Sequence, residues 1–170
     1  MTTYKEIQGL VSSSYKKNKD MEDVGNYKLD KELSTSEAKF FHDSKTGKTI
    51  VANRGTVNTV KDWTNNAMFI KKEYGKTKRF KNAKKVQEKA IDKYGKVDKH
   101  IGHSQSGIIA RKLQKKRMTD EVIQVNPASL GEKSKSNVHT IRANNNVVSV
   151  LHKNNKNTSE LNTWLMESIV

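Results

Sequence analysis

The chain has 170 residues, with 33 Lys and Arg against 18 Asp and Glu, which gives a formal net charge of +15. This length suits one domain with a single core, and a hydrophobic content of 33% predicts that the core is modest. The absence of cysteine excludes a disulfide framework, a thiolate nucleophile and a cysteine-ligated zinc site. No signal peptide or membrane-spanning segment is recognisable, so we expect a cytoplasmic or virion-associated protein.

The first part of the chain predicts a helix followed by short strands. Apolar residues at helical spacing predict a helix over 3–17, and alternation predicts a strand over 27–33. A hairpin is expected from strand 38–42, a turn that contains Gly47, and strand 48–53. Residues 56–70 are expected to form a loop and then a short helix or extended segment.

The second part alternates strands with helices. The clearest helix covers 77–94, with Gly95 as its C-terminal cap. Further elements are expected at strand 97–102, helix 105–117, strands 121–125 and 137–143, a short apolar piece at 147–151, and a tail, 158–170, that is amphipathic enough to form a docking helix. This order predicts an α/β fold with right-handed crossovers and a mostly parallel sheet flanked by helices. Functional groups are then expected at the carboxyl ends of the strands.

The stretch "GHSQSG", residues 102–107, places Ser104 at such a strand end, directly before a helix. Small residues at Gly102, Ser106 and Gly107 would let a sharp strand-to-helix turn form, which would expose the hydroxyl of a nucleophilic serine. The alternative is that Ser104 only caps the following helix.

A second motif, "TIVANRGTVNTVKDW" at residues 49–63, adds to the first. Together with "GHSQSG" it resembles the class 3 (fungal-type) lipases, which are α/β-hydrolases. The later stretches "VIQVNPASLG" and "VHTIRANNNVVSVL" resemble strands of the same family, so the resemblance covers about residues 38–151. The compact chain, rich in lysine and asparagine, also resembles lipase-like proteins of DNA viruses and virophage-like elements.

The resemblance implies a set of site residues. Ser104 matches the nucleophile, and Thr56 and the Gln105 N–H match the oxyanion-hole donors, which would stabilise a tetrahedral intermediate. The remaining matched positions are structural, and they are Arg54, Gly55, Asp62 and Trp63 around the oxyanion loop and Gly102, His103, Ser106 and Gly107 around the serine.

The triad departs from the family pattern. Asn146 stands where the resemblance implies the catalytic aspartate, and an amide does not stabilise an imidazolium as a carboxylate does. Only His152 follows Asn146, and it is therefore the candidate catalytic histidine. His103 is expected to point away from the site of attack, and the orientation of His139 is left open.

Three functions remain open at this point. The first is an esterase or lipase that acts on an acyl ester or lipid through Ser104. The second is a non-catalytic structural or interaction module that keeps the fold, such as a virion component. The third is binding of an anionic surface, either membrane lipid or nucleic acid, through the lysine-rich residues 71–89. No metal and no cofactor is predicted, and the tail leaves an oligomer or partner contact as an alternative.

Overall fold

The computed structural model describes residues 2–55, 77–127, 136–143 and 158–161. Seven strands form one sheet in the order β1-β2-β3-β4-β5-β6-β7. The pairs β1–β2 and β2–β3 are antiparallel, and every later pair is parallel. The strands are β1 (Tyr27–Asp30), β2 (Ala38–Asp43), β3 (Thr49–Asn53), β4 (Lys99–His103), β5 (Glu121–Val125), β6 (Val138–Ala143) and β7 (Thr158–Leu161). The mostly parallel α/β sheet expected from the sequence is confirmed.

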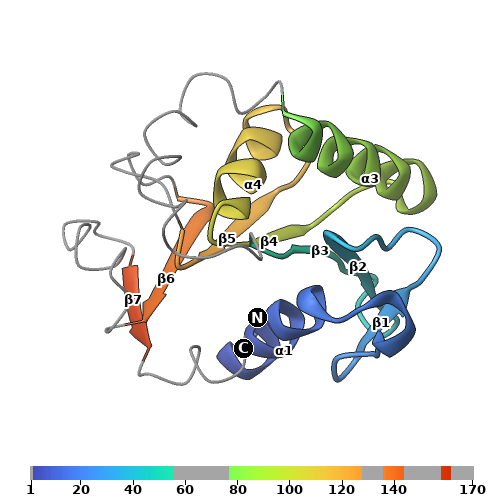
Figure 1. Cartoon of the computed structure of the whole chain (residues 1–170), viewed down its shortest axis with the longest axis horizontal. Helices are drawn as coiled ribbons and strands as arrows, with labels where there is room; N and C mark the ends of the chain where they lie inside the picture. Colours follow the sequence, from blue (N-terminus) through green and yellow to red (C-terminus); the bar gives the residue numbers. More distant parts are fainter. Residues whose placement is uncertain (1, 56–76, 128–135, 144–157, 162–170) are drawn as a thin grey trace.

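Helices cover both faces of the sheet. Helix α1 (Tyr4–Tyr15) lies on one face, and helices α3 (Lys78–Tyr94) and α4 (Ser106–Lys115) lie on the other (Figure 1). Thr3 begins α1 with a reciprocal capping box to Glu6, and the Thr77 hydroxyl caps α3. Gly95 ends α3 in the left-handed conformation (φ 78°), as its position in the sequence predicts.

Two apolar layers follow from the alternation of side chains along the strands. On the α1 face, Leu10 and Val11 pack with Phe41, Ile50 and Ile101. On the opposite face the buried residues fall into smaller clusters under the two helices, which include Phe40, Val51, Val86, Ala90, Phe80, Ile109, Leu113, Val122 and Val138. Consecutive strand residues serve opposite layers because the side-chain period of a strand is two.

The tail differs from expectation. Residues 158–161 form strand β7, parallel to β6, so the expected helix over the tail is wrong for this part of it. An unpaired sheet edge offers a row of backbone donors and acceptors, and pairing with β6 outweighs a helical period in the side chains. The expectations for 56–70, 147–151 and the rest of the tail lie outside the described residues. Within the described residues, no helix is both long and apolar enough to cross a membrane.

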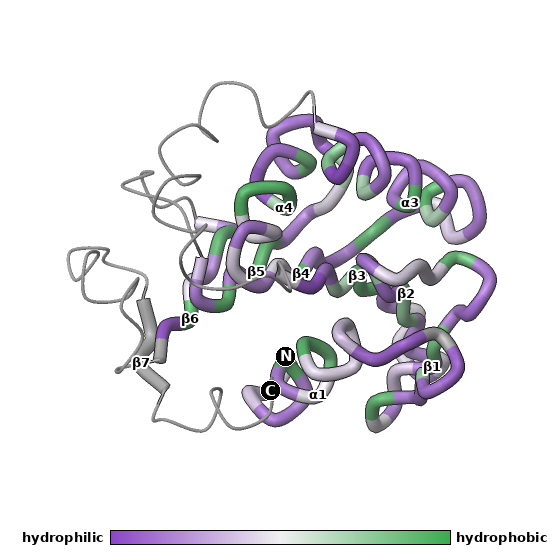
Figure 2. Tube along the Cα trace, viewed as in Figure 1, coloured by the Kyte–Doolittle hydropathy of each residue, from purple (hydrophilic) through white to green (hydrophobic). Residues whose placement is uncertain are grey.

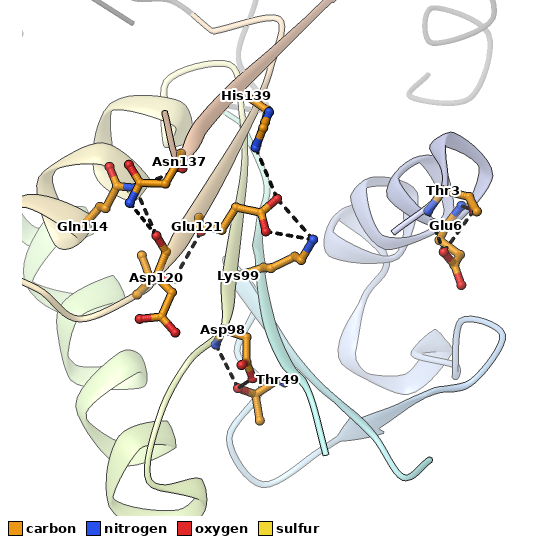
Figure 3. A network of polar contacts seen from close by, with 11 residues as sticks. Thr3, Glu6, Thr49, Asp98, Lys99, Gln114, Asp120, Glu121, Asn137 and His139 are labelled. Atoms are coloured by element: carbon orange, nitrogen blue, oxygen red, sulfur yellow. Dashed lines mark hydrogen bonds and ion pairs between the residues drawn. The ribbon is translucent and has the colours of Figure 1, made fainter. Parts of the chain in front are cut away.

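Polar contacts join the amino ends of the strands (Figure 3). The Asp98 carboxylate accepts hydrogen bonds from the Thr49 N–H and hydroxyl at 2.8 and 3.0 Å. On the neighbouring strands, Lys99 pairs with Glu121 at 2.9 Å. These contacts hold β3, β4 and β5 in register at one edge, which leaves the carboxyl edge to be built by different residues.

Candidate functional site

Ser104 lies at the carboxyl edge of the sheet, directly after β4 and two residues before α4 begins. Its φ is 57°, a left-handed conformation that is uncommon for residues other than glycine. The Ser104 N–H donates to the Val125 carbonyl at 2.9 Å, which fixes the turn against the end of β5. Asn126, the residue after β5, is also left-handed, with a φ of 42°. Two of the three described non-glycine residues with positive φ thus lie at this edge, the third being Arg117 after α4. Such backbone strain is common at functional sites.

Ser104 does not cap the helix. The N-terminal cap of α4 is Gln105, and its side chain makes no capping hydrogen bond. The Ser104 residue is 5% exposed, and its buried Oγ has no hydrogen-bond partner in the described part of the chain. The alternative of an ordinary helix cap is therefore wrong. A buried hydroxyl without a partner is unusual in native proteins and requires an explanation.

Small residues allow the strand and the helix to approach each other. A Cβ at Gly102 would lie 2.7 Å from the Gly107 nitrogen and 2.5 Å from the Ser106 carbonyl carbon. A Cβ at Gly107 would lie 3.1 Å from the Pro127 Cβ, beyond the end of β5. The small residues of "GHSQSG" are thus required sterically, because α4 starts in contact with both β4 and the segment after β5.

The loop after β3 lies against Ser104. Strands β3 and β4 are parallel neighbours, so Arg54 and Gly55 end beside the turn. A Cβ at Gly55 would lie 2.9 Å from the Ser104 Cβ. Ser106 fastens the loop, because its Oγ donates to the Arg54 carbonyl at 2.6 Å. Ser106 therefore ties the loop after β3 to the start of α4.

Two arginines brace the same loop. The Arg79 guanidinium, from the first turn of α3, donates to the carbonyls of Arg54 and Gly55, the latter at 2.9 Å. It also donates to the Ser106 Oγ at 3.1 Å. Arg54 itself reaches back to the Ser36 carbonyl at 2.7 Å. The sequence predicts a structural role for Arg54 in this loop, and these contacts agree with that role.

Tyr15 and His103 form the other side of the turn. The Tyr15 hydroxyl accepts the Gly55 N–H at 2.8 Å and lies 2.5 Å from His103 Nδ1. The phenol oxygen accepts from Gly55, and we assign the phenol O–H as the donor to His103 Nδ1. The proton of the neutral imidazole is then on Nε2. Burial lowers the pKa of His103 to about 4, so the ring is neutral near pH 7. His103 thus contacts α1 and holds the loop through Tyr15.

One backbone N–H that follows Ser104 in the chain is left without a described backbone acceptor. At the start of α4, the Gly107 N–H is taken by the Ser104 carbonyl and the Ile108 N–H by the Gln105 carbonyl. Among the described residues, no carbonyl accepts the Gln105 N–H. A helix N-terminus favours negative charge at such free N–H groups. The second expected donor, Thr56, lies outside the described residues, although its neighbour Gly55 abuts Ser104.

The catalytic partners of Ser104 are not found in the described part of the chain. His42 stacks on Tyr94, and His139 lies 3.6 Å from Glu121 at the amino edge (Figure 3). His100 is fully buried and makes no hydrogen bond to another described residue, and no described imidazole or carboxylate bonds to the Ser104 Oγ. Asn146, His152, Asp62 and Trp63 lie outside the described residues. The described residues also hold no group of three or more side chains suited to a metal ion.

No family model matches the chain, and no curated protein matches it. Two residues of the site, Tyr15 and Arg79, were not predicted from the sequence. They lie 40 and 24 residues from their common partner Gly55, and no local pattern marks such long-range contacts.

Proposed function

We propose that the chain is a carboxylic-ester hydrolase of the class 3 lipase type, with Ser104 as nucleophile and an acyl ester or lipid as substrate. One observation carries the proposal: Ser104 is held in a left-handed conformation (φ 57°), and its buried Oγ has no described partner. Strain and a free hydroxyl are both costly. Their combination at a strand-to-helix turn is typical of a serine with a chemical role.

The reaction uses the groups gathered at the carboxyl edge. Ser104 Oγ attacks the ester carbonyl carbon while its proton passes to a base, for which His152 is the candidate, and the carbonyl oxygen becomes an oxyanion. The Gln105 N–H and the expected Thr56 donors stabilise that oxyanion. Collapse of the intermediate expels the alcohol and leaves the acyl group on Ser104, and water then releases the carboxylic acid. Tyr15 and Arg79 hydrogen-bond to Gly55, the residue before Thr56, and Gly55 lies beside Ser104.

The proposed site is slow. Asn146 stands at the position of the triad acid, and loss of that carboxylate lowers kcat by about 10⁴ in serine proteases. Activated esters should react best, because their leaving groups depart without protonation. Unactivated esters need a general acid and should be poor substrates.

Labelling and turnover test the proposal together. A fluorophosphonate should modify Ser104, as located by mass spectrometry, and the protein should hydrolyse para-nitrophenyl butyrate slowly. Ser104→Ala should lose both signals. Ser13→Ala is the matched control, since Ser13 is another buried serine with an unpartnered Oγ but lies within α1. Equal loss in both variants would overturn the assignment of Ser104.

A second candidate is a non-catalytic structural or interaction module, such as a component of a virion. It is favoured by the lack of any described imidazole that hydrogen-bonds to Ser104. Folded wild-type protein that neither reacts with fluorophosphonate nor shows Ser104-dependent hydrolysis would support this candidate over the first. We propose a cytoplasmic or virion-associated location for the protein under both candidate functions.

A further inference from the structure

A groove of about 510 Å³ is lined by residues of helix α3 and by residues at the C-terminal end of helix α4. Both helices lie on the face of the sheet opposite α1 (Figure 1). Five of its lining side chains are lysines and the sixth is a phenylalanine: Phe80, Lys81, Lys84, Lys112, Lys115 and Lys116. We call this feature the lysine groove. None of the described residues that line it belongs to the Ser104 turn, and two helices separated in the sequence contribute to it.

The packing of the two helices explains the groove. Phe80 and Ala83 of α3 pack against Ile109 and Leu113 of α4. The residues that flank these apolar stripes therefore face each other across the contact. Both helices contribute lysines from these flanking positions to the groove. Lysine stems are apolar and their ammonium groups stay in water, so the walls are methylene and the rim is charged.

Positive charge predominates around the groove. None of the described residues that line it is acidic. Helix α4 has no acidic residue in its sequence, SGIIARKLQK, and α3 has Glu88 and Asp92 against seven basic residues. Lys84 pairs with Glu88, but both side chains are substantially exposed, so this pair neutralises little. Figure 2 shows α3 as hydrophilic over most of its length.

Charge on the α1 side of the molecule is balanced instead. Lys16 pairs with Glu22 and Lys28 with Asp23, each at 2.8 Å. On the outer side, Lys78, Lys85 and Lys89 are exposed along α3 and extend the charge beyond the groove. An array of ammonium groups on one side of a molecule repels itself, and a broad anionic surface relieves that repulsion.

We propose that the lysine groove and the surrounding faces of α3 and α4 bind the phosphate headgroups of an anionic lipid bilayer. The proposal does not depend on the chemistry of Ser104. Lysine acts as a point charge toward phosphate, and lysines near an anionic bilayer each strengthen binding about fivefold. The protein binds at the surface of the bilayer and does not insert an apolar side chain from this face. Tyr4 is the one large apolar side chain exposed among the described residues, and it lies on α1.

Nucleic acid fits the same surface less well. Single strands are bound by aromatic side chains that stack on bases, together with basic residues. Phe80 is only 4% exposed, and none of the described residues of α3 and α4 presents an exposed aromatic ring for stacking. Base-edge recognition usually relies on arginine, asparagine or glutamine in a fixed geometry, whereas the rim here is lysine alone.

Vesicle co-sedimentation tests the proposal on the full chain. Vesicles of phosphatidylcholine with about one third phosphatidylglycerol should bind the protein at low salt, and pure phosphatidylcholine should not. Raising the salt from about 0.05 to 0.3 M should release it, because the Debye length shrinks. The double variant Lys81→Glu/Lys112→Glu should lose at least about 25-fold in affinity, fivefold for each lysine removed.

The control is Lys5→Glu/Lys45→Glu, which changes the net charge equally at exposed positions outside the groove. It should lose less than about threefold in vesicle binding, as expected for charges remote from the bilayer. Equal losses in the two double variants would overturn the lysine groove as the site. Tighter binding to duplex RNA than to the anionic vesicles in the same buffer would assign the surface to nucleic acid instead.

Discussion

Tyr15 is the side chain that joins helix α1 to the loop beside Ser104. Its hydroxyl accepts the Gly55 N–H and, by our assignment, donates to His103 Nδ1. Burial raises the pKa of Tyr15, although the Gly55 N–H and the charges of Arg79 and Arg54 oppose that rise, so the phenol stays protonated near neutral pH. Both hydrogen bonds are therefore retained across the physiological range.

Tyr15→Phe should destabilise the fold by about 1–2 kcal/mol, because the Gly55 N–H and His103 Nδ1 both lose a partner in a part-buried site. Urea unfolding followed by circular dichroism measures the change. Tyr4→Phe is the matched control, since Tyr4 is 48% exposed, and it should change stability by less than about 0.5 kcal/mol. If the two variants unfold alike, the Tyr15 contacts do not stabilise the loop.

At the level of single residues, the sequence predicts local backbone geometry better than contacts between residues that are far apart in the chain. Gly102, Ser104 and Gly107 are close in the chain, so their spacing alone predicts a tight turn, and the left-handed φ of Ser104 agrees with it. Tyr15 and Arg79 contact Gly55 from distant helices. A tyrosine on an amphipathic helix and an arginine in a lysine-rich run look like core and surface residues until the chain folds.

The contact between β4 and α4 depends on one missing Cβ. At Gly102 a methyl group would meet the backbone of Ser106 and Gly107, which has no flexible end that can move aside. Gly102→Ala should therefore destabilise the protein by about 3 kcal/mol or more, the cost of overpacking against a fixed backbone. Thermal unfolding monitored by circular dichroism measures the loss.

Gly47→Ala separates this clash from backbone strain. Gly47 has a φ of 68°, and no atom lies within 4 Å of the position that an alanine methyl group would take, so its substitution costs only the left-handed conformation. That cost is about 1 kcal/mol. A Gly102→Ala protein no less stable than Gly47→Ala would mean that α4 shifts away from β4 without penalty.

At the level of elements, periodicity predicts most of what is observed. Helix α3 combines a long apolar stripe, Thr77 at its start and Gly95 after its end, so pattern and caps agree. Strand β7 shows the limit. Residues 158–161 carry a helical pattern with the rest of the tail, but they pair with β6, and the register Arg142↔Glu160 is a non-local choice that periodicity does not encode.

His100 links one buried side chain to the stability of the whole molecule. It lies on β4 between Val51 of β3 and Val122 of β5, is fully buried, and neither ring nitrogen has a partner in the described part of the chain. Burial lowers its pKa from 6.5 to about 3. The folded state therefore resists protonation in a pH range where the unfolded chain accepts a proton.

The protein should lose stability as the pH falls below 6.5. Between pH 6.5 and about 3, the unfolded state binds a proton at His100 and the folded state does not, so stability falls as the pH falls. The loss approaches about 1.4 kcal/mol per pH unit for this group. His103, with its pKa lowered to about 4, adds a similar loss over a narrower range. The molecule should thus begin to lose stability just below neutrality, where most carboxylates are still ionised.

His100→Leu isolates the contribution of this residue. Leucine has a similar volume and leaves no unpartnered nitrogen, so the variant should be more stable at pH 7 by about 1–3 kcal/mol. Its free energy of unfolding should also fall less steeply with acid, by about 1.4 kcal/mol per pH unit between pH 6 and 4. Urea unfolding at several pH values measures both quantities. A variant that is less stable at pH 7, with an unchanged acid slope, would mean that His100 is protonated in the folded protein, which contradicts a buried neutral ring.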